Sequence, residues 1–422
     1  MSPHVFRTPA HHGGASARGI KPAILVAAAL AVVLLFWHRQ ARYEGGSGLA
    51  LSAPAAPQPA NPPVNLTLAH HLLAMTNLSA VTTAALLDAA GAGLSSADTR
   101  ALVQLHQTLY CSARLNVPDP PGSARAPFSN STMFVYDKGD IVSDHLQGLA
   151  HSWEGQEIKE MLAAMRTPVP QTPADMSRPK SWRAPASPFV IDVGANVGWF
   201  TVNAAAAGGI VAAFEAMSNN VRLVRATLCA NPWIAERVAL YGTGLGTNRT
   251  DCHILSGTTN RGDGHTLCGQ DPEQAAREWT KNTGHSYEVR GSISLMRMDK
   301  VIDNDVQVIK IDVEGYEMNV LRGAEELFKT RNVWFIMAEC NVAILSEEGK
   351  KEYLRFLDSM GYYISGQSFE GPFLDVADIT SGKDIKLPGM NLYCVKKTLR
   401  DANTMAKGRR LLTSGSAAGK AA

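Results

Sequence analysis

The sequence predicts an α/β fold in which a mostly parallel sheet is covered by helices and ends in an antiparallel edge strand. From Phe189 onward, short runs rich in β-branched residues alternate with stretches whose apolar residues recur at helical spacing. The last two predicted strands have only a loop between them, which indicates an antiparallel pair. With 422 residues, 45% of them hydrophobic and 18% charged, the chain can bury a large core.

The elements follow in chain order. Residues 68–166 are predicted to be a helical N-terminal region, with two or three helices over 68–116, a Pro- and Gly-rich loop over 117–127 and helix over 141–165. A linker over 167–188 leads into one domain at 189–397, and 398–422 is predicted to be a disordered basic tail. The predicted strands are FVIDV, IVAAFEA, RVALYGTGL, VQVIKIDV, VWFIMAEC, YYISG and NLYCVKK, with helices predicted over SNNVRLVRATLCAN, MNVLRGAEELFK and EEGKKEYLRFLDSM.

An uncharged apolar run runs from Pro22 to Trp37 between Lys21 and Arg39. As a helix it is about 24 Å long, slightly short of a bilayer core of roughly 27–30 Å, and the flanking cations can reach the interface. We expect a transmembrane anchor over 22–38, a cytosolic tail over 1–21 and a stalk over 39–67, in single-pass type II orientation. A cleaved signal peptide and a buried core helix are the alternatives.

Four glycosylation sequons begin at Asn65, Asn77, Asn130 and Asn248. Together with the anchor they favour a lumenal body in the Golgi or another secretory-pathway membrane, the alternatives being another organelle membrane or secretion.

The six cysteines include no CxxC pair, so a zinc site is not expected. Cys252 and Cys268 are the best disulfide candidates in an oxidising compartment, while Cys340 and Cys394 lie in predicted strands and are expected to be buried thiols.

Charge is distributed unevenly along the chain. Residues 1–60 carry a net charge of +4 and residues 396–422 carry +6, which leaves −8 on the remainder. A nucleic-acid-binding protein would place positive charge on its folded body, so this distribution disfavours a nucleic-acid partner.

A candidate ligand site follows the first strand of the predicted domain, where Asp192 is succeeded by the glycine-containing segment 194–198 and a helix. Free amide groups at such a turn bind ligand carboxylates or phosphates. A dinucleotide site favours glycine where Asn196 stands, whereas S-adenosylmethionine, which has no pyrophosphate, tolerates the larger side chain. Glu215 ends the second strand and can accept hydrogen bonds from ribose hydroxyls. The alternative is a tight turn with a surface acid.

A second group of charged residues lies in the predicted strand VQVIKIDV and just after it. Lys310 and Asp312 are two residues apart and share one face, and Glu314 follows at the strand's carboxyl end. Buried charges must pair or perform chemistry, because an isolated one costs several kcal/mol. The alternative is a structural ion pair, with Glu317 in the first turn of the next helix.

Several strings in their order resemble the FkbM family of methyltransferases: IDVGANVGWF, AAFEAMSNN, MDKVI, and VIKIDVEGYEMNVLRGAEELF with the strand that ends at Glu339. The match covers roughly 189–345 and, more loosely, His151 to Glu154. Ala216 stands where the family usually has proline, and the stretch 243–295 is long and Gly-rich. The resemblance implies a class I, Rossmann-like fold that uses S-adenosyl-L-methionine to methylate a hydroxyl oxygen. By position, it assigns cofactor binding to Asp192, Gly194, Ala195, Asn196, Gly198 and Glu215, and the transfer site to Asp312 and Glu314.

These observations together predict a membrane-anchored O-methyltransferase acting on a glycan or glycoprotein sugar. Asp312 is expected to act as base or to orient the acceptor, Glu314 to assist, and Lys310 to tune both. A catalytically inactive glycan- or protein-binding module and a nicotinamide-dependent oxidoreductase are the alternatives. No metal is expected, because His253, Asp263 and His265 have no strong ligand spacing and are assigned to a solvated loop.

Overall fold

A computed structural model of the chain describes residues 95–112, 119–340, 345–381 and 390–401. The predicted anchor, the stalk, most of the first predicted helices and nearly all of the basic tail lie outside these residues. Within the described part of the chain, no helix is long and apolar enough to cross a membrane.

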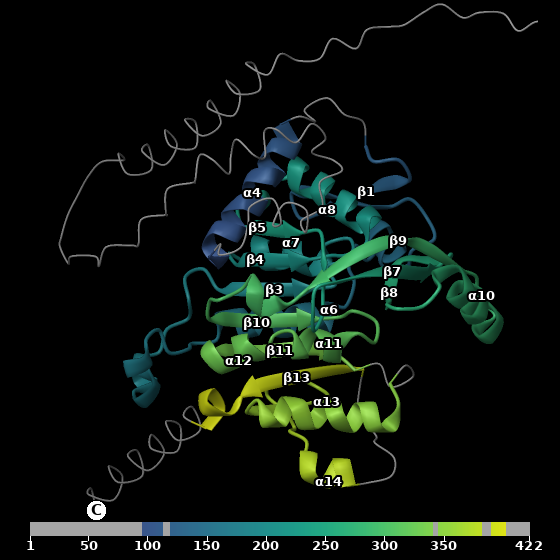
Figure 1. Cartoon of the computed structure of the whole chain (residues 1–422). Helices are drawn as coiled ribbons and strands as arrows, with labels where there is room; N and C mark the ends of the chain where they lie inside the picture. Colours follow the sequence, from purple (N-terminus) through teal and green to yellow (C-terminus); the bar gives the residue numbers. More distant parts are fainter. Residues whose placement is uncertain (1–94, 113–118, 341–344, 382–389, 402–422) are drawn as a thin grey trace, which may run out of the picture. The chain divides into compact units, whose positions relative to one another are not determined.

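The described residues form a seven-stranded sheet of order β12-β13-β11-β10-β3-β4-β5 (Figure 1). The five strands from β11 to β5 run parallel, and β13 joins β11 and β12 by antiparallel pairing. The prediction of a mostly parallel sheet with an antiparallel edge strand is therefore confirmed. The strands of this sheet are β3 (Phe189–Val193), β4 (Ile210–Phe214), β5 (Val238–Tyr241), β10 (Val306–Ile311), β11 (Val333–Glu339), β12 (Tyr362–Ser365) and β13 (Asn391–Lys396).

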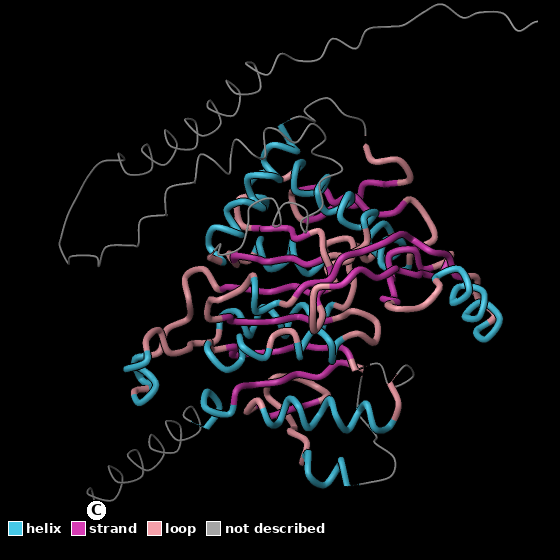
Figure 2. The backbone as a smooth tube through the Cα atoms, viewed as in Figure 1, coloured by secondary structure: helices cyan, strands magenta, loops and turns pink. Residues whose placement is uncertain are grey.

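Helices cover both faces of this sheet, as the elements drawn in Figure 2 show. The strands β5, β10 and β11 are buried along their whole length, so their sequences are mainly apolar instead of alternating. The helices are α4 (Ser96–Ser112), α5 (Ile141–Gln147), α6 (Gly155–Arg166), α7 (Trp199–Ala206), α8 (Ser218–Ala230), α9 (Pro232–Ala235), α10 (Pro272–Thr283), α11 (Glu317–Arg322), α12 (Glu325–Thr330), α13 (Glu347–Ser359) and α14 (Val376–Ser381), with short 3-10 turns η1 (Pro173–Ser177), η2 (Pro179–Ser181) and η3 (Met298–Lys300).

The N-terminal region is not wholly helical as predicted. Residues expected to be loop and helix form an antiparallel hairpin of β1 (Ser123–Phe128) and β2 (Ser131–Tyr136). The β2 sequence STMFVY is rich in residues that favour strands, and its buried side packs against α8. The Thr227 hydroxyl accepts a hydrogen bond from the Phe134 backbone amide at 2.8 Å. Tertiary packing on α8 thus stabilises a two-stranded unit that is marginal alone.

The long stretch between β5 and β10 forms a second sheet, which corrects the expectation of a solvated loop. Its strands are β6 (Gly244–Leu245), β7 (Thr250–Gly257), β8 (Asn260–Leu267) and β9 (Tyr287–Met296), in the order β6-β9-β7-β8, and α10 lies at its far end in Figure 1. A small core that includes Ile254, Ile293 and Leu295 packs against Met217 in the segment after β4. The second sheet therefore lies beside the carboxyl ends of the main strands.

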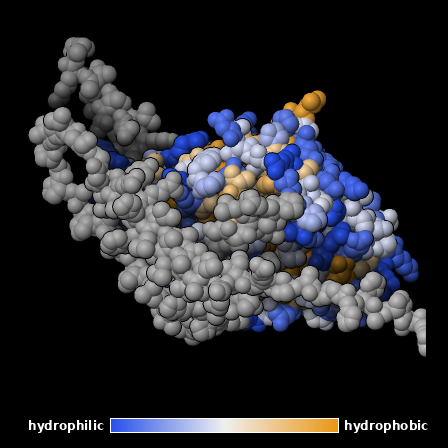
Figure 3. Space-filling model, turned by 90° about the horizontal axis from the view of Figure 1, so that it is seen from above, coloured by the Kyte–Doolittle hydropathy of each residue, from blue (hydrophilic) through white to orange (hydrophobic). Residues whose placement is uncertain are grey.

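Two disulfides are present in the described residues. Cys252–Cys268 joins β7 to the residue after β8 and confirms the predicted pair. Cys111–Cys229, which was not predicted, links α4 to α8 across 118 residues. Cys340 and Cys394 are buried free thiols, as expected. The face shown in Figure 3 carries mainly hydrophilic residues with small scattered hydrophobic areas where the described chain is visible.

Candidate active site

The loop after β3 has the backbone geometry that its glycines predict. Gly194 and Gly198 have φ of +77° and +90°, and Asn196 has φ of +51°. A Cβ on Gly194 would lie 1.7 Å from the backbone carbonyl oxygen of Asp312, so no side chain fits there. The loop is pressed between the ends of β3 and β10.

The amide groups of this loop are mostly not free for a ligand, contrary to the expectation from the sequence. The amides of Gly194 and Ala195 both donate to the Phe214 carbonyl at 3.0 Å, and that of Gly198 donates to the Ala195 carbonyl at 2.7 Å. The Asn196 amide donates to Glu215 Oε2 at 2.7 Å. The loop packs so closely on the end of β4 that its own chain satisfies these donors.

Glu215 is buried at the end of β4 and braces the glycine loop. Besides the bond from Asn196, its Oε1 accepts a hydrogen bond from the Met217 amide at 2.7 Å. Burial raises its pKa to about 7, against the opposing effect of those two amides. Each carboxylate oxygen has a second lone pair, so the side chain can still accept from a ligand hydroxyl.

Lys310 lies at the centre of a buried ion-pair network, as its place beside Asp312 predicted. Its Nζ is 3.1 Å from Asp312 Oδ2 and 3.9 Å from Asp192 Oδ1, and it donates to the Gly194 carbonyl at 3.1 Å. Asp192 also accepts from the Thr201 hydroxyl at 2.6 Å. Burial alone would lower the pKa of Lys310, but the carboxylates of Asp312, Asp192 and Glu154 raise it above its ordinary value. The network fixes the glycine loop to β10.

Asp192 consequently has a different position from the one its predicted role requires. Asp192 is 1% exposed and contacts Lys310 and Thr201, so it stabilises the glycine loop from the buried end of β3. It lines neither of the two cavities at this site. The register of β3 and β10, which pairs Asp192 with Lys310, places the two charges together.

Glu314 and Glu339 extend the acidic site at the carboxyl ends of β10 and β11. Glu314 has φ of +53° and follows Asp312 by two residues, while Glu339 is the last residue of β11. Burial, reinforced by Asp312 as the next largest cause, raises the pKa of both carboxyl groups. Sequence reasoning missed Glu339 as a site residue, although its place at the end of a buried strand was a usable signal.

The segment Trp153-Glu154 borders the same site, as the looser part of the resemblance implied. Glu154 has φ of +44° at the start of α6, and burial raises its pKa to about 7. The Trp153 carbonyl accepts a hydrogen bond from Trp199 Nε1 at 2.8 Å, which ties this segment to the helix after the glycine loop.

Glu317 lies in the first turn of α11, as the alternative interpretation of the sequence expected. Its Oε1 accepts from the amides of Val313 and Gly315 at 3.1 and 3.0 Å, and it begins α11. It therefore shapes the turn that carries Glu314.

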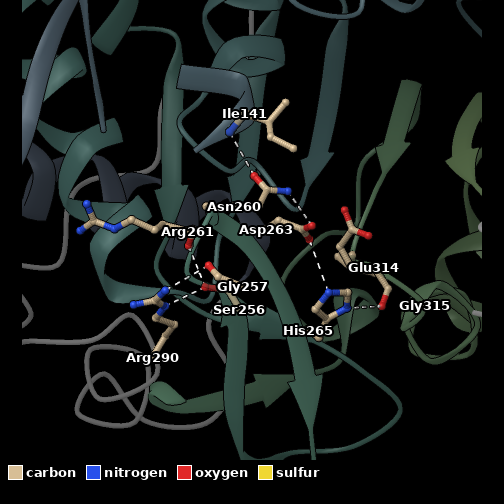
Figure 4. Close-up of polar contacts among 12 residues, drawn as sticks. Ile141, Ser256, Gly257, Asn260, Arg261, Asp263, His265, Arg290, Glu314 and Gly315 are labelled. Carbon is tan, nitrogen blue, oxygen red and sulfur yellow. Dashed lines mark hydrogen bonds and ion pairs between the residues drawn. The ribbon is translucent and has the colours of Figure 1, made fainter. Parts of the chain in front are cut away.

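The second sheet supplies a further wall of the site (Figure 4). Asp263 accepts a hydrogen bond from Asn260 Nδ2 at 2.8 Å, and one of its oxygens lies 3.8 Å from His265 Nε2. His265 Nδ1 is 3.4 Å from the Glu314 carbonyl oxygen. His253 lies elsewhere on β7, where its Nδ1 is 3.4 Å from the Ser292 hydroxyl. The three residues that the sequence grouped are therefore only partly together.

β8 lies against the glycine loop without room for larger residues. A Cβ on Gly262 would be 2.5 Å from both Asn196 Oδ1 and Asp140 Oδ1. The Gly262 amide donates to Asp140 at 2.8 Å, and its carbonyl accepts from Asn220 at 2.9 Å. These bonds hold β8 over the loop.

Two cavities meet at this site. One, of about 70 Å³, is lined by Gly194, Phe214 and Glu215; the other, of about 310 Å³, is lined by Trp153, Glu154 and Lys310. The residues that line both are Asn196, Asp263, Asp312 and Glu314.

The residues of the smaller cavity fit the cofactor that the resemblance implies. Asn196 Oδ1 is buried without a hydrogen-bond partner among the described residues, and Glu215 retains free lone pairs beside it. Such acceptors suit a ligand that carries hydroxyl and amino donors.

Comparison with protein families assigns this fold to the methyltransferases. Residues 192–364 match the family model described as the methyltransferase FkbM domain. The chain therefore carries an FkbM methyltransferase domain, and the resemblance noted from its motifs is confirmed. This match favours the methyltransferase class over a nicotinamide-dependent oxidoreductase.

Solved structures similar to this chain include methyltransferases from several bacteria. Methyltransferase FkbM from Methylobacillus flagellatus KT is 17% identical with a TM-score of 0.31, over 50% of this chain and 44% of its own. A SAM-dependent methyltransferase from Agrobacterium tumefaciens is 7% identical with a TM-score of 0.31, over 67% of this chain and 72% of its own. An O-methyltransferase from Bacillus cereus in complex with SAH is 14% identical with a TM-score of 0.26, over 61% of this chain and 98% of its own.

The match to the Methylobacillus protein thus spans less than half of that protein's length. Among curated proteins, no sequence matches this chain. The family match, and not these distant structures, supports the assignment.

Proposed function

We propose that this chain is an O-methyltransferase that transfers a methyl group from S-adenosyl-L-methionine to a hydroxyl of a glycan or glycoprotein sugar. The observation that carries the proposal is the position of Asp312. Asp312 lines both cavities, of which one lies beside the glycine loop and the other is wide enough for part of an acceptor. It follows directly on the carboxyl end of β10, a strand in the middle of the sheet.

The cofactor, when bound, supplies a methyl group activated by the positive charge of its sulfonium. Glu215 and Asn196 are the side chains of the smaller cavity that would hold its hydroxyl and amino groups. The carboxyl groups of Asp312, Glu314 and Glu339 lie close together around one lysine, and a positively charged ligand beside them would stabilise their ionised forms.

Asp312 is placed to orient the acceptor hydroxyl and to accept its proton at a carboxylate oxygen. A hydroxyl is a weak nucleophile, so a base within hydrogen-bond reach contributes about 10²–10⁴-fold to the rate. Glu314 lies beside it and assists. Lys310 holds the Asp312 side chain in place through the contact at 3.1 Å.

The wider cavity has features that suit a sugar. Trp153 and Trp199 offer apolar surface, and Asn260, Asn391 and Glu154 offer donors and acceptors for hydroxyl groups.

A lumenal location with an anchor over 22–38, in a Golgi or other secretory-pathway membrane, is part of the proposal. The two disulfides support it, because such bonds persist in oxidising compartments. The sequon residues Asn130 and Asn248 are both exposed and thus accessible to glycosylation.

The proposal is tested by incubating the purified full chain with methyl-labelled cofactor and a mixed pool of glycans. Mass spectrometry should find a glycan heavier by one methyl group, lost in Asp312→Asn. The variant should still bind the cofactor in calorimetry, because Asn keeps the shape of the side chain.

Glu352→Gln serves as the control, since Glu352 is an exposed carboxylate on α13. Near-normal turnover by Asp312→Asn would refute its role. Absence of cofactor binding by the wild-type chain would instead favour the alternative of an inactive binding module.

A further inference from the structure

Three carboxylates meet at the carboxyl ends of two neighbouring strands. Asp312 follows β10, Glu314 lies two residues later, and Glu339 ends β11, which pairs in parallel with β10. One carboxylate oxygen from each of the three lies within 4.8 Å of the others. We call these three residues the carboxylate trio. Carboxylates held this close repel one another unless a cation or protons lie between them.

Glu339 gives an independent sign that the trio faces a ligand. It is 7% exposed, and its Oε2 has no hydrogen-bond partner among the described residues. A buried carboxylate oxygen without a partner costs several kcal/mol, so native structures rarely leave one unexplained. Glu339 lines the wider cavity together with both other members of the trio, so an ion held by the three would border a space that a ligand can enter.

Within the trio, Lys310 forms an ion pair with Asp312 alone. Its Nζ contacts Asp312, Asp192 and the Gly194 carbonyl. In the described part of the chain, no ion pair reaches Glu314 or Glu339.

We propose that the carboxylate trio binds one divalent cation that prefers oxygen ligands, Mg²⁺ or Mn²⁺. Ions of this kind are held by a few carboxylates and complete their coordination with water or substrate oxygens. The trio supplies one oxygen from each of three side chains and leaves the cavity side open for further ligands. The cation site goes beyond the expectation from the sequence, which assigned no metal to this chain.

The site also deepens the proposed function, on which its catalytic meaning rests. An acceptor hydroxyl that binds a divalent cation becomes more acidic, because the cation stabilises the negative oxygen. The cation would lie between the trio and the wider cavity, where the acceptor is placed. The trio therefore binds and orients the acceptor oxygen through the ion.

A second group that shares Glu314 is the competing site. Asp263, His265 and Glu314 also bring one ligand atom each within 4.8 Å. In this group Asp263 Oδ1 is also without a hydrogen-bond partner among the described residues, but Asp263, with 24% of its side chain exposed, is not buried as Glu339 is. The His265 ring is already packed against Trp279 and Tyr287 at centroid distances of 5.2 and 6.1 Å. The trio is favoured because it contains a buried residue, Glu339, whereas all three members of the competing group are only partly buried.

The test measures Mn²⁺ binding by electron paramagnetic resonance on the full chain, without cofactor or acceptor. We expect one Mn²⁺ per chain to disappear from the free-ion signal and to return when Mg²⁺ is added in excess. Glu339→Gln should weaken Mn²⁺ binding at least tenfold. His265→Asn should leave it within about threefold, and so should the exposed control Glu352→Gln. Circular dichroism and thermal melting report whether each variant is folded.

Asp312→Asn provides a second loss of a ligand if Glu339→Gln does not fold, and the same tenfold weakening is expected. The proposal is overturned if the folded wild-type chain binds no Mn²⁺. It is also overturned if His265→Asn abolishes binding while Glu339→Gln retains it, because the ion then belongs to the competing group. Binding of Mn²⁺ without methyl transfer to any glycan would support the site and count against the proposed function alone.

Discussion

Replacing Lys310 by methionine should destabilise the fold strongly. The side chain is buried and within 3.1 Å of Asp312 and 3.9 Å of Asp192, which is itself 1% exposed. Methionine fills a similar volume but leaves both carboxylates without their cation, and the Gly194 carbonyl loses its donor. Breaking a buried ion pair by removing one partner costs about 3–5 kcal/mol. That loss is a large part of a typical total of about 5–15 kcal/mol.

The measurement is the free energy of unfolding from urea titrations of Lys310→Met and wild type. Lys329→Met is the matched control, because Lys329 and Glu325 form an exposed pair at 3.5 Å. Exposed pairs of this spacing contribute about 0.3–0.5 kcal/mol. The control should therefore be nearly as stable as the wild type.

The deficit of Lys310→Met should also depend on pH. Burial raises the pKa of Asp192, and the attraction of Lys310 opposes that rise. Without the lysine the pKa rises further, so the folded variant binds a proton that the unfolded chain releases, and its stability falls as the pH rises. The deficit should be smaller at pH 5 than at pH 8. A loss below about 1 kcal/mol at pH 8, or a deficit independent of pH, would refute the assigned role of Lys310.

Three further predictions concern the glycine loop after β3, the buried carboxyl group of Glu215 beside it, and the disulfide Cys111–Cys229. Gly194→Ala places a Cβ 1.7 Å from a backbone carbonyl oxygen, so it should weaken cofactor binding and lower the melting temperature. Gly208→Ala is the control, because its Cβ meets no atom within 4 Å and adds only a positive-φ strain of about 1–2 kcal/mol. Equal effects of the two substitutions would contradict the geometry of the loop. Glu215 has a pKa of about 7 against an ordinary 4.5, so between these pH values the folded protein holds a proton that the unfolded chain releases. The free energy of unfolding should therefore fall as the pH rises from 4.5 to 7, and urea titrations of Glu215→Gln should show a smaller dependence on pH. An unchanged dependence would show that the pKa of Glu215 is not raised. Cys229→Ser should lower the free energy of unfolding by about 2–5 kcal/mol, because the disulfide to Cys111 closes a loop of 118 residues. Adding a reductant to the wild type should give the same loss. No loss in either experiment would show that the disulfide does not form.

The main sheet could be predicted because its physical causes are local. Buried parallel strands are mainly apolar, and the runs around Ile191, Ile309 and Ile336 have this composition, interrupted by Asp192 and Lys310. The glycines of the loop after β3 predicted a tight turn, and the two-residue spacing of Lys310 and Asp312 predicted that their side chains share one face of the strand. The methyltransferase class followed from the resemblance of these segments to the FkbM family.

The hairpin of β1 and β2 could not be found by the same reasoning. Its strands are short, and β1 contains alanine, arginine and proline, which favour no strand. It exists because its buried side packs on α8 and a Thr227 hydroxyl accepts from its backbone. The Cys111–Cys229 bond likewise depends on the packing of α4 beside α8, which no sequence spacing reports.

The sequence by itself determined the class of fold and the position of the glycine loop, and it indicated Lys310, Asp312 and Glu314 as candidate site residues, all of which line the wider cavity. Only the tertiary structure decided which charges meet. Strand register placed Asp192 on Lys310, inside the sheet and away from both cavities. The pairing of β10 with β11 brought Glu339 to Asp312 and Glu314, and the folding of the second sheet brought Asp263 to the same edge. The physical reason is that hydrophobic pattern fixes which face of a strand is buried, whereas distances between side chains from different strands depend on pairing and register.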